Sequence, residues 1–246
     1  MSKLEELSKL AKPAAEKIKA QPFVRVVSHH DADGITACGI VCHMLRRLRI
    51  PFQATIVSNL EPSISTVLDP RQFVIFCDMG SGQPEIVNGF DAIVLDHHIP
   101  QEGNNKVQVN PHLIGQDGGL EVSAAGVCYA LARIMGDNRD LAGLAISGAI
   151  GDKQKMVGAN RDILDESVEA GVVVVQKGLK LGRGPLEKVL TYSTDPYFDF
   201  SGKPDDAGKF VAELGLHGNI ESLSPEELKR LSSALVLKLL KKSPPD

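Results

Sequence analysis

Three groups of acidic and histidine side chains each follow a short apolar run in the first half of the chain. These groups are His29-His30-Asp31-Ala32-Asp33, then Asp78, and then Asp96-His97-His98. Ligands of open parallel sheets bind beyond the carboxyl ends of the strands. If the apolar runs are strands of one such sheet, we expect the three groups to converge on a single site.

Carboxylates mixed with imidazoles suit Mn²⁺ or Mg²⁺ better than zinc or calcium. Zinc often recruits cysteine, and none of the four cysteines forms a C-x-x-C pair. The candidate ligands are also too many for one ion. Two ions about 3.5–4 Å apart are a common arrangement for the hydrolysis of phosphate esters.

The first group has a regular spacing. His29, Asp31 and Asp33 alternate along the chain, so an extended segment would point them the same way. Gly34 would then permit a sharp turn into the next helix. Taken singly, each aspartate is better explained as a helix cap or a solvated carboxylate than as a ligand. The combination of the three groups favours metal binding.

The elements that must position these groups are strands and helices in alternation. Continuous apolar runs are typical of strands buried on both faces of a parallel sheet. Such runs are Phe23–Val27, Phe52–Val57, Phe73–Cys77 and Ala92–Leu95. Helices are predicted at residues 1–20, Ile35–Arg49, Val122–Met135 and Leu141–Ile150. The alternation predicts an α/β fold with a mostly parallel sheet flanked by helices.

The remainder of the chain has a different, helical character. We predict a helix over Ile163–Leu179, loops over Gly178–Asp206, and a last helix opened by the capping box of Ser224, Pro225 and Glu227. The chain is therefore expected to comprise an α/β catalytic domain over residues 1–160, including an N-terminal helix, and a helical extension over residues 161–246.

Composition limits the classes of function. Aromatic residues make up 4% of the 246 residues and the net charge is −4, which argues against a base-stacking platform or a generally basic coat for nucleic acid. No apolar run approaches the roughly 20 residues of a membrane span. The charged, amphipathic N-terminus has no apolar signal core. We therefore expect a soluble, cytoplasmic protein without a membrane partner.

Four segments, in this order, resemble the motifs of the DHH phosphoesterases. They are the His-x-Asp-x-Asp-Gly run His29–Gly34, Asp78, Asp96–His98 and Gly148–Asp152, with Val122–Gly126 similar to the helix start that precedes the fourth motif. The resemblance covers about residues 20 to 160. The form of the first motif and the stretch Tyr192–Tyr197 are most similar to archaeal RecJ-like nucleases, among them the nuclease associated with the GINS replication complex.

The resemblance implies a role for each residue. One ion would take His29, Asp31 and Asp78, and the other would take Asp33, Asp78, His97 and Asp152. Asp78 would bridge the ions, and a water or hydroxide between them would be the nucleophile. His98 would contact the scissile phosphate, and Asp96 would orient the histidine pair. Mn²⁺ is the preferred metal, and Mg²⁺ is the alternative.

Four further residues are candidates for substrate contact. His112 follows Asn110-Pro111 near the expected site, and Lys153, Lys155 and Arg161 follow Asp152. A basic patch at the rim would bind phosphate groups of a substrate. A solvated basic face is the alternative interpretation of the three basic side chains.

These features predict a metal-dependent phosphodiesterase, a RecJ-like exonuclease that hydrolyses single-stranded DNA or RNA by a two-metal mechanism. RecJ-like proteins normally carry a second lobe with a Gly-Gly-Gly-His motif, which this sequence lacks, so we expect that substrate-binding lobe to be absent. One alternative is a small-substrate phosphoesterase for short oligonucleotides, cyclic dinucleotides or pyrophosphate. Another is a replisome component that docks the GINS complex through its leucine-striped last helix, although such a stripe also suits a core.

Overall fold

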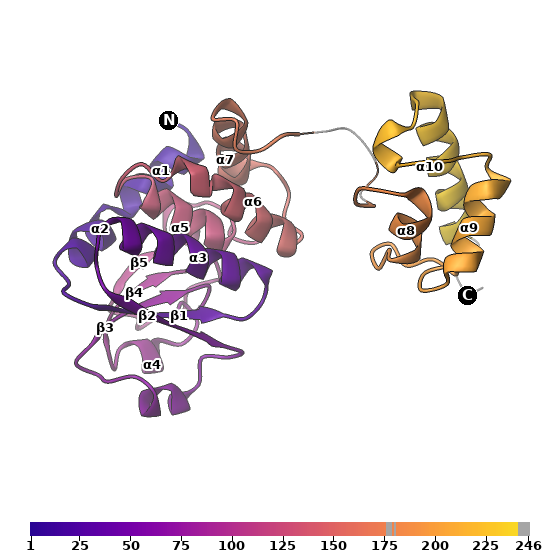
Figure 1. The fold of residues 1–246 in the computed structure, drawn as a ribbon. Helices are drawn as coiled ribbons and strands as arrows, with labels where there is room; N and C mark the ends of the chain where they lie inside the picture. The colour runs from indigo at the N-terminus through magenta and orange to yellow at the C-terminus, as the bar shows by residue number, and fades with distance from the viewer. Residues whose placement is uncertain (176–178, 180, 241–246) are drawn as a thin grey trace. The chain divides into compact units, whose positions relative to one another are not determined.

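The computed structural model describes residues 1–175, 179 and 181–240. The chain divides into two compact units, Met1–Val174 and Val175–Asp246 (Figure 1). Buried apolar clusters form separately in the two units. Among the described residues, no helix is both long and apolar enough to cross a membrane.

The first unit is built on a five-stranded, entirely parallel sheet with the order β2-β1-β3-β4-β5. Its strands are β1 (Val24–His29), β2 (Phe52–Val57), β3 (Phe73–Cys77), β4 (Asp91–Leu95) and β5 (Val107–Val109). This architecture confirms the predicted α/β fold. Because β1 has β2 on one side and β3 on the other, the chain changes its direction of travel across the sheet at β1 and β3. That switch point opens a crevice beyond the carboxyl ends of these two strands.

Helices cover the two faces of the sheet unequally (Figure 1). The thick layer contains α1 (Lys3–Leu10), α2 (Lys12–Lys19), α3 (Ala32–Arg47), α5 (Ala124–Ala132), α6 (Ala142–Gly151) and α7 (Gly158–Glu169). The thin layer contains only α4 (Pro84–Val87) and the 3₁₀ helix Pro62–Thr66. Alternate strand residues face the two layers, with Val26 and Ile75 in the first core and Val27 and Phe76 in the second.

Several element boundaries differ from those predicted. The N-terminal segment forms two helices rather than one, and α3 begins at Ala32 rather than Ile35 because Asp31 caps it. The three-residue strand β5 was not predicted. The helix predicted over Ile163–Leu179 ends at Glu169, where Gly171 adopts a φ of 70°. Residues 176–178 of that prediction lie outside the described residues.

The second unit is a small helical cluster. It contains α8 (Leu186–Thr191), α9 (Pro204–Glu213), the 3₁₀ helix Ile220–Ser222 and α10 (Pro225–Leu240). The predicted capping box is confirmed, since Ser224 N donates to Glu227 Oε2 at 2.8 Å and Glu227 N donates to Ser224 Oγ at 3.3 Å. The segment Gly178–Asp206 was predicted to be mostly loop, but it contains α8, whose Leu186 and Leu190 are buried in the core of this unit.

The boundary between the units lies after α7, not at the predicted residue 160. α7 packs against α6 and α1, and the side chain of Asp162 accepts the N–H of Leu4 at 2.9 Å. These contacts include α7 in the first unit.

Candidate metal centre

The carboxyl ends of β1 and β3 bring His29 and Asp78 together at the switch point of the sheet. His29 is the last residue of β1, and Asp78 follows the last residue of β3. His29 Nδ1 lies 3.4 Å from Asp78 Oδ2 and 2.8 Å from Asp31 Oδ2. These three side chains form the first of the ligand groups.

Asp31 has the predicted extended backbone, but Asp33 lies inside α3, so the prediction that the extended segment continues to Asp33 was wrong. Asp31 is the N-cap of α3 and accepts the N–H of Gly34 at 2.9 Å. Asp33 lies in the first helical turn, and its side chain is fully buried. The helical geometry separates the two carboxylates, so that Asp31 faces His29 while Asp33 faces His97.

Gly34 has a different role from the predicted sharp turn. It lies inside α3, and a Cβ placed there would be 2.4 Å from the carbonyl oxygen of His29. Only glycine therefore allows the first turn of α3 to approach the end of β1 this closely.

The N-terminus of α5 holds Asp33. Both oxygens of Asp33 accept backbone N–H groups, from Ala124 at 2.7 Å and from Ala125 at 2.9 Å. Ser123 caps the same helix by accepting the N–H of Gly126 at 3.3 Å. A helix N-terminus favours negative charge, so α5 helps to stabilise a carboxylate that has no exposure to water.

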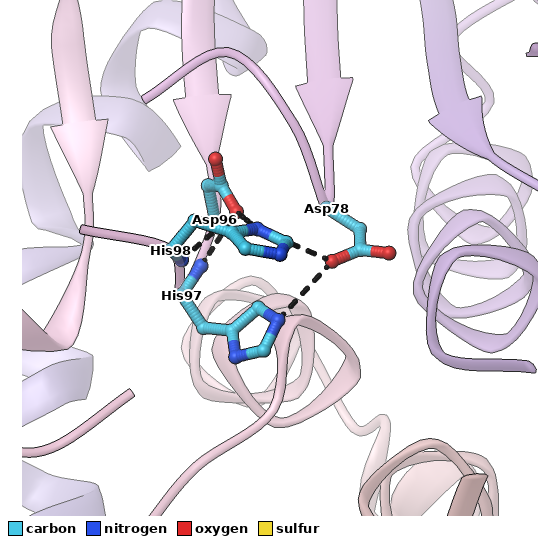
Figure 2. Close-up of side chains that lie close together, drawn as sticks. All are labelled: Asp78, Asp96, His97 and His98. Atoms are coloured by element: carbon cyan, nitrogen blue, oxygen red, sulfur yellow. Dashed lines mark hydrogen bonds and ion pairs between the residues drawn. The ribbon is translucent and has the colours of Figure 1, made fainter. Parts of the chain in front are cut away.

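Asp78 presents one carboxylate oxygen to each side of the site. Oδ2 faces His29, while Oδ1 lies 3.3 Å from His97 Nε2 (Figure 2). The backbone of Asp78 has a φ of 58°, and its N–H donates to Leu95 O at 2.9 Å. Asp78 Oδ1 is buried and accepts no hydrogen bond from the described residues. A buried oxygen without a donor is what a cation would satisfy.

The second ligand group surrounds His97 Nε2. This nitrogen lies 3.3 Å from Asp152 Oδ2, which follows α6 as its C-cap, and 3.8 Å from Asp33 Oδ2. The other ring nitrogen, Nδ1, is 2.7 Å from the carbonyl oxygen of Gly118. Since a carbonyl only accepts, Nδ1 carries the proton and Nε2 faces the carboxylates.

Asp96 and His98 form a third cluster beside Asp78 (Figure 2). Asp96 Oδ1 accepts His98 Nδ1 at 2.8 Å and the N–H of His97 at 2.8 Å, and Oδ2 accepts the N–H of Ser81 at 3.0 Å. Asp96 is buried, whereas the side chain of His98 is 59% exposed. The arrangement leaves the Nε2 edge of His98 available to a molecule in solution.

The crowding of carboxylates perturbs their protonation. Burial, together with the charge of Asp78, raises the pKa of Asp33 to about 6. Burial alone would lower the pKa of His97, but contact with Asp78 and the hydrogen bond to Gly118 raise it to about 10. Burial would raise the pKa of Asp96, yet the hydrogen bond from His98 and that histidine's charge bring it to about 2. The site therefore attracts positive charge.

The residues fit two divalent ions. Potential ligand atoms lie within 4.8 Å of one another in three groups, which are His29, Asp31 and Asp78, then Asp33, His97 and Asp152, and finally Asp78, Asp96, His97 and His98. The first two groups contain the six ligands predicted from the sequence, with Asp78 between them. Their donors are carboxylate oxygens and imidazole nitrogens, which suit Mn²⁺ and Mg²⁺.

A cavity of about 270 Å³ opens beside this centre. Its lining comprises His29, Ser58, Asn59, Leu60, Asp78, Met79, Gly82, Gln83, Asp96 and His98. Ser58 and Asn59 directly follow β2, so they extend the same carboxyl edge of the sheet. Ser58 and Asn59 were not among the predicted site residues, although a polar pair immediately after a predicted strand was a signal that could have identified them.

The four predicted substrate contacts lie outside the lining of this cavity. His112 is half-buried with Nε2 close to Gly118, while Lys153 and Lys155 lie on either side of Gln154 in the chain. Arg161 is exposed and pairs with Asp165 at 2.8 Å. Their role in substrate binding stays a prediction.

The order of the sequence motifs agrees with a known family. The family model described as the DHH family, N-terminal domain, matches residues 23–149. The chain belongs to the DHH family. Members of the DHH family are phosphoesterases. The DHH residues Asp96, His97 and His98 thus lie at the centre of the site described above.

A curated relative of this DHH chain is an uncharacterized protein of Methanocaldococcus jannaschii. The two are 37% identical over 255 residues, which cover 97% of this chain and 59% of the relative. The chain therefore spans about three fifths of the length of that relative.

Two solved structures share the DHH fold of this chain. The RecJ–Mn²⁺ complex from Thermus thermophilus aligns with a TM-score of 0.52 at 19% identity, covering 98% of this chain and 38% of that one. CDC45 from Entamoeba histolytica aligns with a TM-score of 0.57 at 13% identity, covering 96% of this chain and 56% of that one. At these identities the likeness concerns the fold alone.

Proposed function

We propose that this chain is a two-metal phosphodiesterase that releases nucleotides from single-stranded DNA or RNA. The observation that supports the proposal best is the placement of Asp78, whose two oxygens face two separate ligand groups. A carboxylate shared in this way is typical of sites that hold two ions close together. The first ion would be held by His29, Asp31 and Asp78, and the second by Asp33, Asp78, His97 and Asp152.

Two bound divalent ions would supply Lewis-acid stabilisation of the phosphoryl charge and would acidify water at the site. The chain's own groups complete the site. His98, fixed by Asp96 at Nδ1, presents Nε2 to a phosphate oxygen in the cavity. Its hydrogen bond to Asp96 raises the pKa of His98, which favours the charged imidazolium beside a phosphate.

A nuclease assay tests the proposal. Wild type, Asp78→Asn and a control, Asp69→Asn, whose partly exposed carboxylate pairs with Arg71, are incubated with an end-labelled single strand and Mn²⁺. We expect mononucleotides from wild type and from the control, and none above background from Asp78→Asn. Equal release by wild type and Asp78→Asn would refute the proposed chemistry.

A small-substrate phosphoesterase is the second candidate, and the cavity beside the centre favours it. The cavity measures about 270 Å³, and no lysine or arginine of the described chain lines it. Such a pocket suits one nucleoside better than a long polyanion. A panel of dinucleotide, cyclic dinucleotide, pyrophosphate and a long strand separates the candidates by relative kcat/KM, and a clear preference for the long strand would exclude this second function.

Docking of the GINS complex has weaker support. Leu231 and Leu235 of α10 are buried in the core of the second unit, so this part of the leucine stripe is not available to a partner. A pull-down with GINS subunits tests the idea, and absence of retention at micromolar concentration would reject it.

A further inference from the structure

One carbonyl oxygen, that of Gly118, accepts two side-chain donors beside the centre. His97 Nδ1 donates to it at 2.7 Å, and Gln154 Nε2 donates to it at 2.8 Å. The Gln154 nitrogen also lies 3.3 Å from His97 Nδ1. Gln154 is therefore placed against the edge of the His97 ring that points away from the carboxylates.

Asn160 fixes which way the amide of Gln154 faces. Asn160 Nδ2 donates to Gln154 Oε1 at 2.8 Å and to Lys155 O at 3.2 Å. Because the Gln154 oxygen is occupied by this donor, its NH₂ group must face Gly118. Asn160 is itself 1% exposed and lies in the first turn of α7. A continuous chain of hydrogen bonds thus connects α7 to His97.

The loop that carries Gly118 is held closely against His97. A Cβ at Gly118 would lie 1.9 Å from the carbonyl oxygen of His97, so only glycine fits there. Gln154 Nε2 also lies 3.4 Å from Val122 O, which secures the far side of the same loop. The position of the Gly118 carbonyl therefore depends on Gln154 as well as on the loop itself.

We propose that Gln154 and Asn160 are positioning residues that hold His97 in its Nδ1–H tautomer and thereby set the affinity of the ion bound by Asp33, His97 and Asp152. The inference rests on the proposed metal centre. Neutral His97 binds a cation through Nε2 only when Nδ1 carries the proton, and the acceptor of that proton selects this tautomer. Loss of such a partner typically weakens metal binding about 10–100-fold.

The effect should be confined to one ion. No described hydrogen bond links Gln154 or Asn160 to His29 or Asp31, so the first ligand group keeps its geometry. A general loss of structure would instead lower the affinity for both ions. The difference between the two affinities therefore separates positioning from simple destabilisation.

Two measurements on the full chain test the proposal. The first is titration with Mn²⁺, in which the electron paramagnetic resonance signal of free Mn²⁺ counts bound ions. The second is the ¹⁵N spectrum of histidine-labelled, metal-free protein. It is recorded in alkaline buffer, where the His97 ring is neutral, and it reports which ring nitrogen carries the proton. Gln154→Met keeps the length of the side chain and removes its hydrogen bonds, and Asn160→Ala removes only the support of the amide. Gln53→Ala, on the exposed edge strand β2, is the matched glutamine control.

We expect Gln154→Met to weaken one of two Mn²⁺ sites about 10–100-fold and to leave the other unchanged. Asn160→Ala should act in the same direction, and both variants should lower the population of the Nδ1–H tautomer of His97. Unchanged binding of both ions, or equal weakening of both, would overturn the proposal. If the wild type binds no Mn²⁺, the proposed function fails, while the His97 spectrum of metal-free protein still decides whether Gln154 selects the tautomer.

Discussion

Asp96 holds His98 by its Nδ1 proton at 2.8 Å, and the backbone in turn holds Asp96. The N–H groups of Ser81 and His97 donate to the same carboxylate at 3.0 Å and 2.8 Å. The His98 ring is therefore fixed by a buried, rigid anion rather than by a mobile side chain.

Asp96→Asn should lower kcat about 10–100-fold with little change in KM. The amide keeps the size of the side chain but loses the negative charge that favours the imidazolium form of His98. Steady-state kinetics on a dinucleotide substrate measures the effect, with Asp69→Asn as the control. A variant with the kcat of wild type would show that His98 acts without this partner.

Asp78→Asn and Asp152→Asn should differ in the number of ions they lose. Asp78 faces both ligand groups, whereas Asp152 belongs only to the group of His97 and Asp33. Isothermal titration with Mn²⁺ should show two sites in wild type, one tight site in Asp152→Asn and no tight site in Asp78→Asn. Retention of one tight site in Asp78→Asn would contradict the bridging role.

Gly148→Ala should destabilise the first unit by about 1–3 kcal/mol. A Cβ at Gly148 would lie 2.3 Å from Asp33 Oδ1 and 2.6 Å from the Cβ of Ala125, so α6 would have to move away from α3 and α5. Gly39→Ala in α3 is the control, because its Cβ meets only Leu144 Cδ1, at 3.6 Å. That substitution should instead stabilise the helix, by about 0.4–1 kcal/mol. Urea unfolding of both variants decides the matter, and similar effects in the two would argue against the close packing at Gly148.

Mn²⁺ should stabilise one unit and not the other. All proposed ligands lie within residues 1–174, and the second unit has a separate core. At a free concentration about 100 times the dissociation constant, one bound ion adds about 2.7 kcal/mol to the free energy of unfolding. Calorimetry should show two unfolding transitions. The midpoint temperature of one should rise with Mn²⁺ and fall back when the ion is chelated, and that of the other should not change. Equal shifts of both transitions would contradict this independence.

The ion pair of Arg47 with Asp140 should contribute a small, pH-dependent stabilisation. Arg47 donates to the two oxygens of Asp140 at 2.7 Å and 2.6 Å, which lowers the pKa of Asp140. Both side chains are more than a third exposed, so Asp140→Asn should cost at most about 1 kcal/mol at neutral pH. Because the pKa of Asp140 is lower in the folded state, its ionised carboxylate stabilises the fold at pH values above the ordinary aspartate pKa. This stabilisation is lost as the pH falls below about 4. Denaturation of both proteins at neutral pH and at about pH 3 checks the sign, since the difference should shrink at low pH.

Much of the sheet was predictable because its strands are continuous apolar runs. β2 and β3 have the predicted bounds, and Asp78 and Asp96 follow β3 and β4 as expected, whereas His29 is the last residue of β1 rather than lying beyond it. β5 was not predictable, since a strand of only three residues that includes Gln108 is too short to show a continuous apolar run. α8 lies in a Gly- and Pro-rich segment, and its helix is stabilised by burial of Leu186 and Leu190 rather than by local signals. Tertiary packing decided these elements.

The same distinction applies to the site. Ligand types and strand ends indicated which side chains gather, because these features are local. The support of His97 was not predictable, since Gln154 reaches Gly118 across 36 residues of chain through a backbone carbonyl. The extended spacing was correct for Asp31 but wrong for Asp33, because the cap at Asp31 starts α3 earlier than the apolar pattern does.

The hydrogen bonds from Ala124 and Ala125 to Asp33 have a consequence for the motions of the site. These two amide protons can exchange with deuterium only while the carboxylate has moved away from the end of α5. Their exchange rates therefore report how often the Asp33 carboxylate moves away from the N-terminus of α5. A slow rate would mean that Asp33 stays in place for as long as the surrounding helices remain folded.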